Sequence, residues 1–347
     1  VHHIEQYKTF YGVDSYWDKF QFLRLIGPLG VILFFVLSGF LITYLLMAEE
    51  KENKQINIGH FYLRRVLRIW PLYFLVLLLA FLVFPQFESL HWPQFPNEIV
   101  FAHWPQKLLL FVFFLPNLVA AIYEPIPFAS HTWSIGVEEQ FYLAWPVLFR
   151  YLKRYRLALL VVIAIGHPII GNFLASRYSE FVPHRIEVRT FWSSFNMNCM
   201  AIGSILGILL YQKHRMLNLL LHPATFYFAI ASTVGLIVWG GNVPYVQYEV
   251  YAILFGIIIL HFAARKQLEH AMETPWVHYL GKISYGLYML HPICVALAIR
   301  AGISLGITTN WLLYPVAIAL TITLASISYR FFESPFLRLK PRTAKES

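Results

Sequence analysis

The stretch "HFYLRRVLRIWPLYFLVLLL" (residues 60–79) places three arginines directly before an apolar run. The apolar segment at 66–84 has about the 20-residue length that a transmembrane α-helix needs. Basic side chains at one end of such a segment are typical of its cytoplasmic end. The stretch therefore predicts a helical membrane protein whose arginines lie at the cytoplasmic face.

The composition of the whole chain points the same way. Of the 347 residues, 58% are hydrophobic and 13% are charged, and the mean hydropathy is +0.58, whereas soluble domains carry about 25% charged residues. The net charge of +9 then fits basic cytoplasmic loops better than a nucleic-acid partner, and we expect no such partner. Cys199 and Cys294 fall in apolar segments without a metal or redox motif, so we expect packing roles for both.

Apolar segments of spanning length recur along the chain. Their approximate bounds are 27–48, 66–84, 134–150, 157–175, 194–212, 224–240, 246–264, 283–300 and 309–332. Basic clusters fall between alternate segments, at 51–68, 150–156, 212–215, 264–270 and 338–345. All of these clusters then lie on one side of the membrane, which the positive-inside rule makes cytoplasmic.

One further apolar stretch, residues 107–122, does not fit this topology, because a span here would reverse the side of every later basic cluster. We expect a re-entrant or interfacial element on the outer face. No internal repeat or low-complexity linker divides the chain, so we expect residues 1–347 to form a single transmembrane domain. The chain opens without the basic and apolar regions of a signal peptide.

Two adjacent carboxylates, Glu138 and Glu139, lie just inside the predicted span 134–150. Ionisable side chains in a span cost roughly 2.5 to 3.5 kcal/mol, so each is a functional hypothesis by default. A role at the helix start, with Ser134 as N-cap, explains one carboxylate. Glu138 and Tyr142 share one helical face, however, so a cap and a functional site are about equally favoured.

The arginines of the first stretch also allow two interpretations. Arg64 is sufficiently explained as a topology-setting charge that reaches the interface. Arg65 and Arg68 are spaced i, i+3, so their guanidinium groups point the same way from one helix turn. Because guanidinium groups match phosphate oxygens bidentately, this pair predicts a grip for a nucleotide-type polyphosphate, with Pro71 kinking or breaking the helix nearby.

Other ionisable residues carry weaker signals. His2, His3 and Glu5 by themselves predict an ordinary polar loop start. His291 fits a hydrogen-bonded structural histidine, and Glu333 fits a structural pairing with a nearby arginine. The chain lacks the P-loop, zinc, dinucleotide and nucleophile-elbow motifs of soluble enzymes.

Six strings occur together in an order that resembles the membrane-integral acyltransferase family 3. They are "GVILFFVLSGFLITYLL" (30–46), "FYLRRVLRIWPLYFLVLLL" (61–79), "TWSIGVEEQFYLAWPVL" (132–148), "AIGSILGILL" (201–210), "ISYGLYMLHPI" (283–293) and "YRFFESP" (329–335). The resemblance covers nearly the whole chain. A single string would be a weak signal, but the six in order form a specific one.

The resemblance implies an all-α, polytopic bundle of about ten spans, of which the first is represented here only by its outer end. Family members take an acyl group, usually acetyl, from cytoplasmic acyl-CoA. They deliver it to a hydroxyl of a glycan or lipid-linked saccharide, commonly outside the inner membrane. We therefore expect a multi-pass O-acetyltransferase of the bacterial inner (plasma) membrane, with a cytoplasmic C-terminus, acetyl-CoA as donor, no metal and no appended hydrolase-like domain.

The resemblance also implies residue roles. His3 matches the family's essential histidine, with His2 as the fallback, and the partner arginine would precede the present sequence. Arg65 and Arg68 match the RxxR motif, and Glu138 matches the glutamate of the WS…VE motif. His3 is then expected to act as general base or acyl carrier, Glu138 to orient it or to bind the acceptor, and the arginines to hold CoA.

The acceptor is expected to contact three further residues of the same motif region, namely Trp133, Ser134 and Tyr142. Asn196 and Asn198 stand where many family members have an arginine and an aspartate, so acceptor handling is expected to differ. O-antigen, exopolysaccharide, peptidoglycan and secondary metabolites all fit as acceptors. A transporter of a glycan, lipid or small anion is the alternative function, and a non-catalytic scaffold is a third.

Overall fold

The computed structural model describes residues 1–240, 243–265 and 273–341, which form helices and connecting turns without strands. The all-α prediction is confirmed. The chain divides into two compact units. The first unit comprises Val1–Lys19, Asn57–Trp133 and Pro275–Ser347, and the second comprises Phe20–Ile56 and Ser134–Thr274. The organisation as a single domain stays a prediction.

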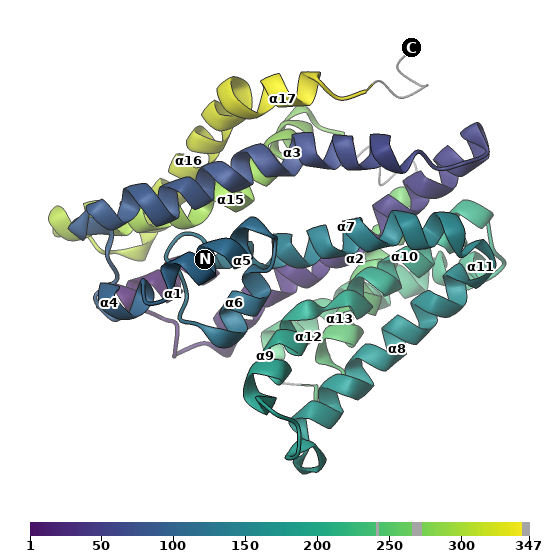
Figure 1. Ribbon diagram of the computed structural model, residues 1–347, viewed down its shortest axis with the longest axis horizontal. Helices are drawn as coiled ribbons and strands as arrows, with labels where there is room; N and C mark the ends of the chain where they lie inside the picture. The colour runs from purple at the N-terminus through teal and green to yellow at the C-terminus, as the bar shows by residue number, and fades with distance from the viewer. Residues whose placement is uncertain (241–242, 266–272, 342–347) are drawn as a thin grey trace. The chain divides into compact units, whose positions relative to one another are not determined.

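The first unit is built around three long helices, which shorter helices accompany (Figure 1). Its helices are α1 (His2–Phe10), α3 (Ile58–Leu78), α4 (Asn97–Val100), α5 (Trp104–Val112), α6 (Pro116–Ile122), α15 (Pro275–Ser304), α16 (Asn310–Ser328) and α17 (Ser334–Arg338). The Tyr285 hydroxyl on α15 donates to the Ile69 carbonyl on α3 at 2.7 Å. Two π-helical turns, Leu79–Val83 and Tyr329–Glu333, continue α3 and α16.

A buried carboxylate fixes α1 within this unit. Glu5 is fully buried and accepts hydrogen bonds from the Tyr314 hydroxyl of α16 at 2.5 Å and from the Ser15 hydroxyl at 2.8 Å. Lys8, one turn along α1, donates to Asn310 at 2.6 Å. The first residues thus form a helix that is held by distant parts of the chain. The expectation of an ordinary polar loop start is wrong, because Glu5 and Lys8 bond to residues near 310 that local sequence does not indicate.

The second unit contains the remaining helices. They are α2 (Gln21–Asn53), α7 (Trp133–Tyr151, in this unit from Ser134), α8 (Arg156–Ala175), α9 (Arg185–Phe195), α10 (Met197–Gln212), α11 (Leu217–Leu220), α12 (Pro223–Trp239) and α13 (Gln247–Ala264). Leu206 and Leu209 of α10 pack with Phe40 of α2 and Leu260 of α13 in its apolar core.

The contact between α2 and α10 depends on glycine. A Cβ atom at Gly39 would lie 2.0 Å from the Met200 carbonyl oxygen, and one at Gly203 would lie 2.0 Å from the Val36 carbonyl oxygen. No side chain fits at either position, so the two backbones meet directly, as small residues allow between membrane helices.

Seven helical stretches are long and apolar enough to cross a membrane within the described residues. They are Gln21–Asn53, Ile58–Gln86, Lys153–Ala175, Arg185–Gln212, Gln247–Ala264, Pro275–Ser304 and Asn310–Arg338. Two other predicted spans form α7 and α12. The first of these carries Glu138, Glu139 and Arg150 within 19 residues, and the second is only 17 residues long.

The structure also tests several local predictions. Residues 107–122 form the short helices α5 and α6 instead of one spanning helix, in keeping with the expectation that they do not cross as a single span. The helix of Ser134 begins at Trp133, so the N-cap interpretation of Ser134 is wrong. Both cysteines are free and buried, as packing residues would be. The basic clusters at 264–270 and 338–345 lie partly outside the described residues.

Candidate functional site

Three histidines from distant parts of the sequence meet inside the first unit. The ring centroids of His3 on α1 and His291 on α15 lie 4.9 Å apart. His131, in the turn before α7, has its ring centroid 5.5 Å from that of His291. We call these three residues the histidine cluster.

Hydrogen bonds define which ring nitrogens carry protons. His291 places Nδ1 2.6 Å from the Tyr288 carbonyl oxygen, which can only accept, so Nδ1 is the protonated nitrogen. His3 places Nδ1 3.1 Å from the Gln6 amide oxygen. With Nδ1–H donating to Gln6, the lone pair of neutral His3 lies on Nε2, as in a histidine that serves as a base.

The backbone of His131 is held by a hydrogen bond, while its ring makes aromatic contacts with Tyr288 and His291. The Tyr288 hydroxyl donates to the His131 carbonyl at 2.5 Å. Both ring nitrogens are buried, and neither makes a hydrogen bond of normal geometry to the described residues. Burial lowers the pKa of His131 well below its usual range, and the neighbouring His291 and His3 lower it further. The His131 ring nitrogens are therefore able to hydrogen-bond to a bound group.

No group of three or more histidine, cysteine or carboxylate side chains in residues 1–240, 243–265 and 273–341 could hold a metal ion. Neutral imidazoles such as those of the histidine cluster are suited to acid–base chemistry.

The predicted arginine pair lies on α3 of the same unit. The α3 helix begins after Asn57, whose side chain accepts from the His60 amide at 3.0 Å, and it continues without a break through Pro71. The Arg65 guanidinium lies 5.6 Å from the Phe61 ring centroid. Arg68 is exposed and exerts an electrostatic effect on the buried Glu333. The expected pairing of Glu333 with an arginine stays a prediction.

Glu138 lies in the second unit, where it joins α7 to α2. Its Oε1 accepts from the Ser38 hydroxyl at 2.5 Å and from the Tyr142 hydroxyl. Glu138 and Tyr142 thus share a face and a hydrogen bond, as their spacing predicts. One turn after Tyr142, Trp145 donates to Thr43 at 2.8 Å, which extends the polar contact between the two helices.

The other two predicted acceptor residues are the first two residues of α7. Trp133 opens the helix within the first unit, and Ser134 is buried at the start of the second. His3 and Glu138 also belong to different units, so direct cooperation between them stays a prediction.

The two asparagines that depart from the family pattern have local roles. Asn198 of α10 donates to Glu249 of α13 at 2.6 Å. Asn196 has a φ of 35° between α9 and α10 and donates to the carbonyls of Ser193 and Ser194. The Asn198 side chain therefore connects α10 to α13, whereas the Asn196 side chain bonds to carbonyls at the end of α9.

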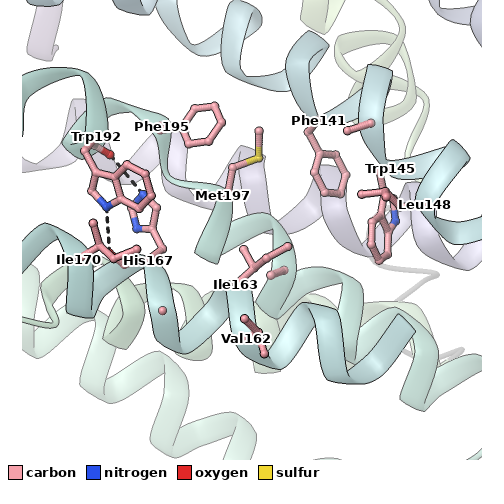
Figure 2. A pocket seen from close by; sticks show the side chains of 13 residues that line it. Phe141, Trp145, Leu148, Val162, Ile163, His167, Ile170, Trp192, Phe195 and Met197 are labelled. Carbon is pink, nitrogen blue, oxygen red and sulfur yellow. Dashed lines mark hydrogen bonds between the residues drawn. The ribbon is translucent and has the colours of Figure 1, made fainter. Parts of the chain in front are cut away.

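A separate cavity of about 380 Å³ lies among α7, α8, α9 and α10 of the second unit (Figure 2). His167 and Trp192 stack at 5.0 Å and hydrogen-bond to each other's backbone carbonyls, as the dashed lines of Figure 2 show. Phe141, Trp145 and Met197 line other parts of the cavity. Among the described residues no charged side chain lines it, so this lining offers no ionic contact to a phosphate.

The structure adds residues to the predicted site. His131 and His291 join His3, although His291 was expected to be only structural and His131 was not singled out. Ser38 joins Glu138 from 100 residues away in sequence. Local spacing carries no signal for such contacts. The only available signal was histidine itself, which is seldom placed in an apolar environment without a partner or a function.

Comparison with known proteins identifies the fold family and several relatives. A family model described as an acyltransferase domain matches residues 1–330. The peptidoglycan O-acetyltransferase OatA of Listeria monocytogenes is 22% identical over 327 residues, covering 89% of this chain and 51% of the relative. The putative peptidoglycan O-acetyltransferase YrhL of Bacillus subtilis is 25% identical over 331 residues, covering 89% and 50%.

A putative O-acetyltransferase of Staphylococcus aureus strain COL is 24% identical over 341 residues, covering 89% of this chain and 52% of the relative. The chain thus spans about half the length of the curated relatives it matches. No solved structure has a significant match.

Proposed function

The chain belongs to the membrane-integral acyltransferase family 3, and we propose on this basis that it transfers an acetyl group from cytoplasmic acetyl-CoA to a glycan hydroxyl. The names of the relatives support a saccharide of the bacterial cell envelope, free or lipid-linked, with peptidoglycan as the first acceptor to test. The seven apolar helical stretches support a multi-pass membrane protein. The bacterial inner membrane as its location and a cytoplasmic C-terminus are part of the proposal and rest on the family resemblance and the positive-inside rule.

The observation that carries this proposal is the histidine cluster. We assign His3 as the reacting histidine from the family resemblance. Its ring centroid lies 4.9 Å from that of His291, which in turn lies 5.5 Å from that of His131. Burial keeps such imidazoles neutral, and a neutral imidazole is the form that accepts a proton from an acceptor hydroxyl.

In the proposed reaction, His3 Nε2 removes the proton from the acceptor hydroxyl while the hydroxyl oxygen attacks the thioester carbonyl. The carbon–sulfur bond breaks, and the departing CoA sulfur receives the proton from the His3 imidazolium. His131 donates a ring N–H to the carbonyl oxygen or to the acceptor, which satisfies one of its buried nitrogens. Acylation of His3 itself, followed by transfer, is the stepwise form of the same reaction.

The donor and acceptor have separate proposed sites. Arg65 and Arg68, one turn apart on α3, hold phosphates of CoA at the cytoplasmic end of the first unit. Glu138, with Ser38 and Tyr142, offers a carboxylate and two hydroxyl groups, a combination suited to a saccharide. Trp133 and Ser134 complete this acceptor region by sequence.

The test is transfer of labelled acetyl groups from acetyl-CoA by membranes that contain the full-length protein. His3→Ala is expected to lower the turnover rate about 10²- to 10⁴-fold, the range that general acid–base groups contribute. Arg65→Ala and Arg68→Ala are expected to raise the KM for acetyl-CoA. His2→Ala is the matched control and is expected to keep most of the activity.

Two results would contradict the proposal. Full transfer by both His3→Ala and Arg68→Ala would remove the roles assigned to these residues. Absence of both transfer and thermal stabilisation by acetyl-CoA in the wild-type protein would favour a transporter or scaffold instead.

A further inference from the structure

A cavity of about 720 Å³ lies at the end of the first unit that carries the π-helical turn Tyr329–Glu333. Its lining comes from α15, α16, the π-helical turn and α17. The lining residues are Tyr279, Ser326, Ile327, Tyr329, Arg330, Phe331, Ser334, Leu337 and Arg338. We call this the arginine cavity.

The described lining of the arginine cavity carries only positive charge. Arg330 and Arg338 line it, and none of the described carboxylates does. Glu333, in the same turn as Arg330, is buried, and its Oε1 accepts from Ser328 at 2.9 Å and lies against Gly286 of α15. The acidic side chain of this turn therefore faces the helices, whereas both arginines are exposed and available to an anion.

Aromatic rings stand beside these charges. Tyr279 and Tyr329 line the cavity, and Phe331 is 69% exposed, with the Arg330 guanidinium 5.4 Å from its ring centroid. Guanidinium groups with exposed aromatic faces bind phosphate and stack on a planar base. The combination fits a nucleotide better than an isolated phosphate.

The cavity also neighbours the proposed donor site. The α3 helix packs against α17 and against the π-helical turn. Arg68 of α3 interacts electrostatically with Glu333 of that turn. The arginine pair of α3 and the arginine cavity thus belong to one end of the same unit.

We propose that the arginine cavity binds the adenosine 3′-phosphate end of acetyl-CoA, while Arg65 and Arg68 hold its pyrophosphate. This inference rests on the proposed function, because it takes CoA as the donor. CoA carries one phosphate on the ribose and two in the pyrophosphate, so one arginine pair cannot match all three bidentately. A second pair beside an aromatic wall supplies the missing contacts.

The test compares acetyl-CoA with acetyl-dephospho-CoA, which lacks only the 3′-phosphate, as donors for the full-length protein in nanodiscs. The wild-type protein is expected to show a KM about tenfold higher for the dephospho donor, because one charge-assisted contact is lost. In the double variant Arg330→Ala/Arg338→Ala, the KM for acetyl-CoA rises about tenfold or more, kcat is unchanged, and the KM ratio between the two donors falls to near one.

Arg65→Ala and Arg68→Ala raise the KM values for both donors and leave their ratio unchanged, because these arginines are proposed to bind the pyrophosphate that both donors contain. Arg154→Ala, an exposed arginine of the second unit, is the matched control and changes neither value. Thermal unfolding of each variant verifies that it is folded.

A lipid headgroup offers the same phosphate chemistry, so the assay is run with and without anionic phosphatidylglycerol in the nanodiscs. The ratio of the KM values for the two donors is expected to be the same in nanodiscs with and without phosphatidylglycerol. An effect of the double variant that requires anionic lipid, or a ratio that the double variant retains, would overturn the inference while acetyl transfer stands. A wild-type protein that transfers nothing from acetyl-CoA would instead overturn the proposed function.

Discussion

Gln6 holds the His3 ring through one hydrogen bond, with His3 Nδ1 3.1 Å from its amide oxygen. Gln6→Met keeps a side chain of similar length and removes the acceptor. We expect kcat to fall about tenfold with little change in KM, because the nitrogen that we propose as the base loses its orientation. Gln6→Glu restores an acceptor and is expected to recover much of the loss. Equal kcat values for the Met variant and wild type would show that the bond is dispensable.

The pH dependence of transfer is a second prediction at the residue scale. The pKa of His131 is lowered by burial and by His291 and His3, so protons enter the histidine cluster only below the ordinary imidazole pKa of about 6.5. Activity that needs neutral imidazole is present above the lowered pKa and is lost as the pH falls through it. Initial rates should therefore be nearly constant from about pH 8 to about pH 6. Loss of activity with a midpoint near the ordinary imidazole pKa would contradict the burial of the histidine cluster.

At the scale of elements, the contact of α2 with α10 can be tested with a matched pair on one helix. Gly39→Ala places a methyl group against the Met200 carbonyl, whereas Gly30→Ala on α2 meets no atom within 4 Å. Overpacking of this kind costs typically about 1 to 3 kcal/mol or more. Gly39→Ala should lower the midpoint of thermal unfolding in detergent by several degrees, and Gly30→Ala should leave it unchanged. Similar unfolding midpoints for the two variants would mean that α2 and α10 can move apart to accommodate the methyl group at little cost in stability.

The elements also show where hydropathy succeeds as a predictor. Long apolar runs such as that of α3 become helices because every backbone polar group must be paired in lipid. The π-helical turns, the break between α5 and α6, and the exact start of α7 could not be predicted, because they depend on packing against distant residues. The prediction of Ser134 as N-cap is wrong because the helix already begins at Trp133.

At the scale of the whole molecule, the topology gives a labelling prediction. Both native cysteines are buried, so single introduced cysteines can be labelled with little background. Arg154→Cys lies in a basic cluster and should react only from the cytoplasmic side. Glu180→Cys, in the exposed loop before α9, should react only from outside. Labelling of the Arg154→Cys variant from outside would reverse the proposed orientation.

Some contacts of the candidate site can be predicted from the sequence, and others cannot. Paired residues on one helix, such as Arg65 with Arg68 and Glu138 with Tyr142, follow from helical periodicity. The partners of His3 do not, because His131 and His291 come from segments more than 100 residues away. Long-range packing brings them together, and a single sequence carries no record of it.

Gly39, Gly203 and Gly207 have a consequence for genetic screens. All three lie in strings that carry the family resemblance, yet each is required by backbone contact between α2 and α10 and not by chemistry. A screen for loss of acetylation would score substitutions there alongside substitutions of His3. Protein abundance in the membrane would separate the two groups, because the glycine variants should be destabilised and less abundant, whereas the His3 variants should accumulate as inactive protein.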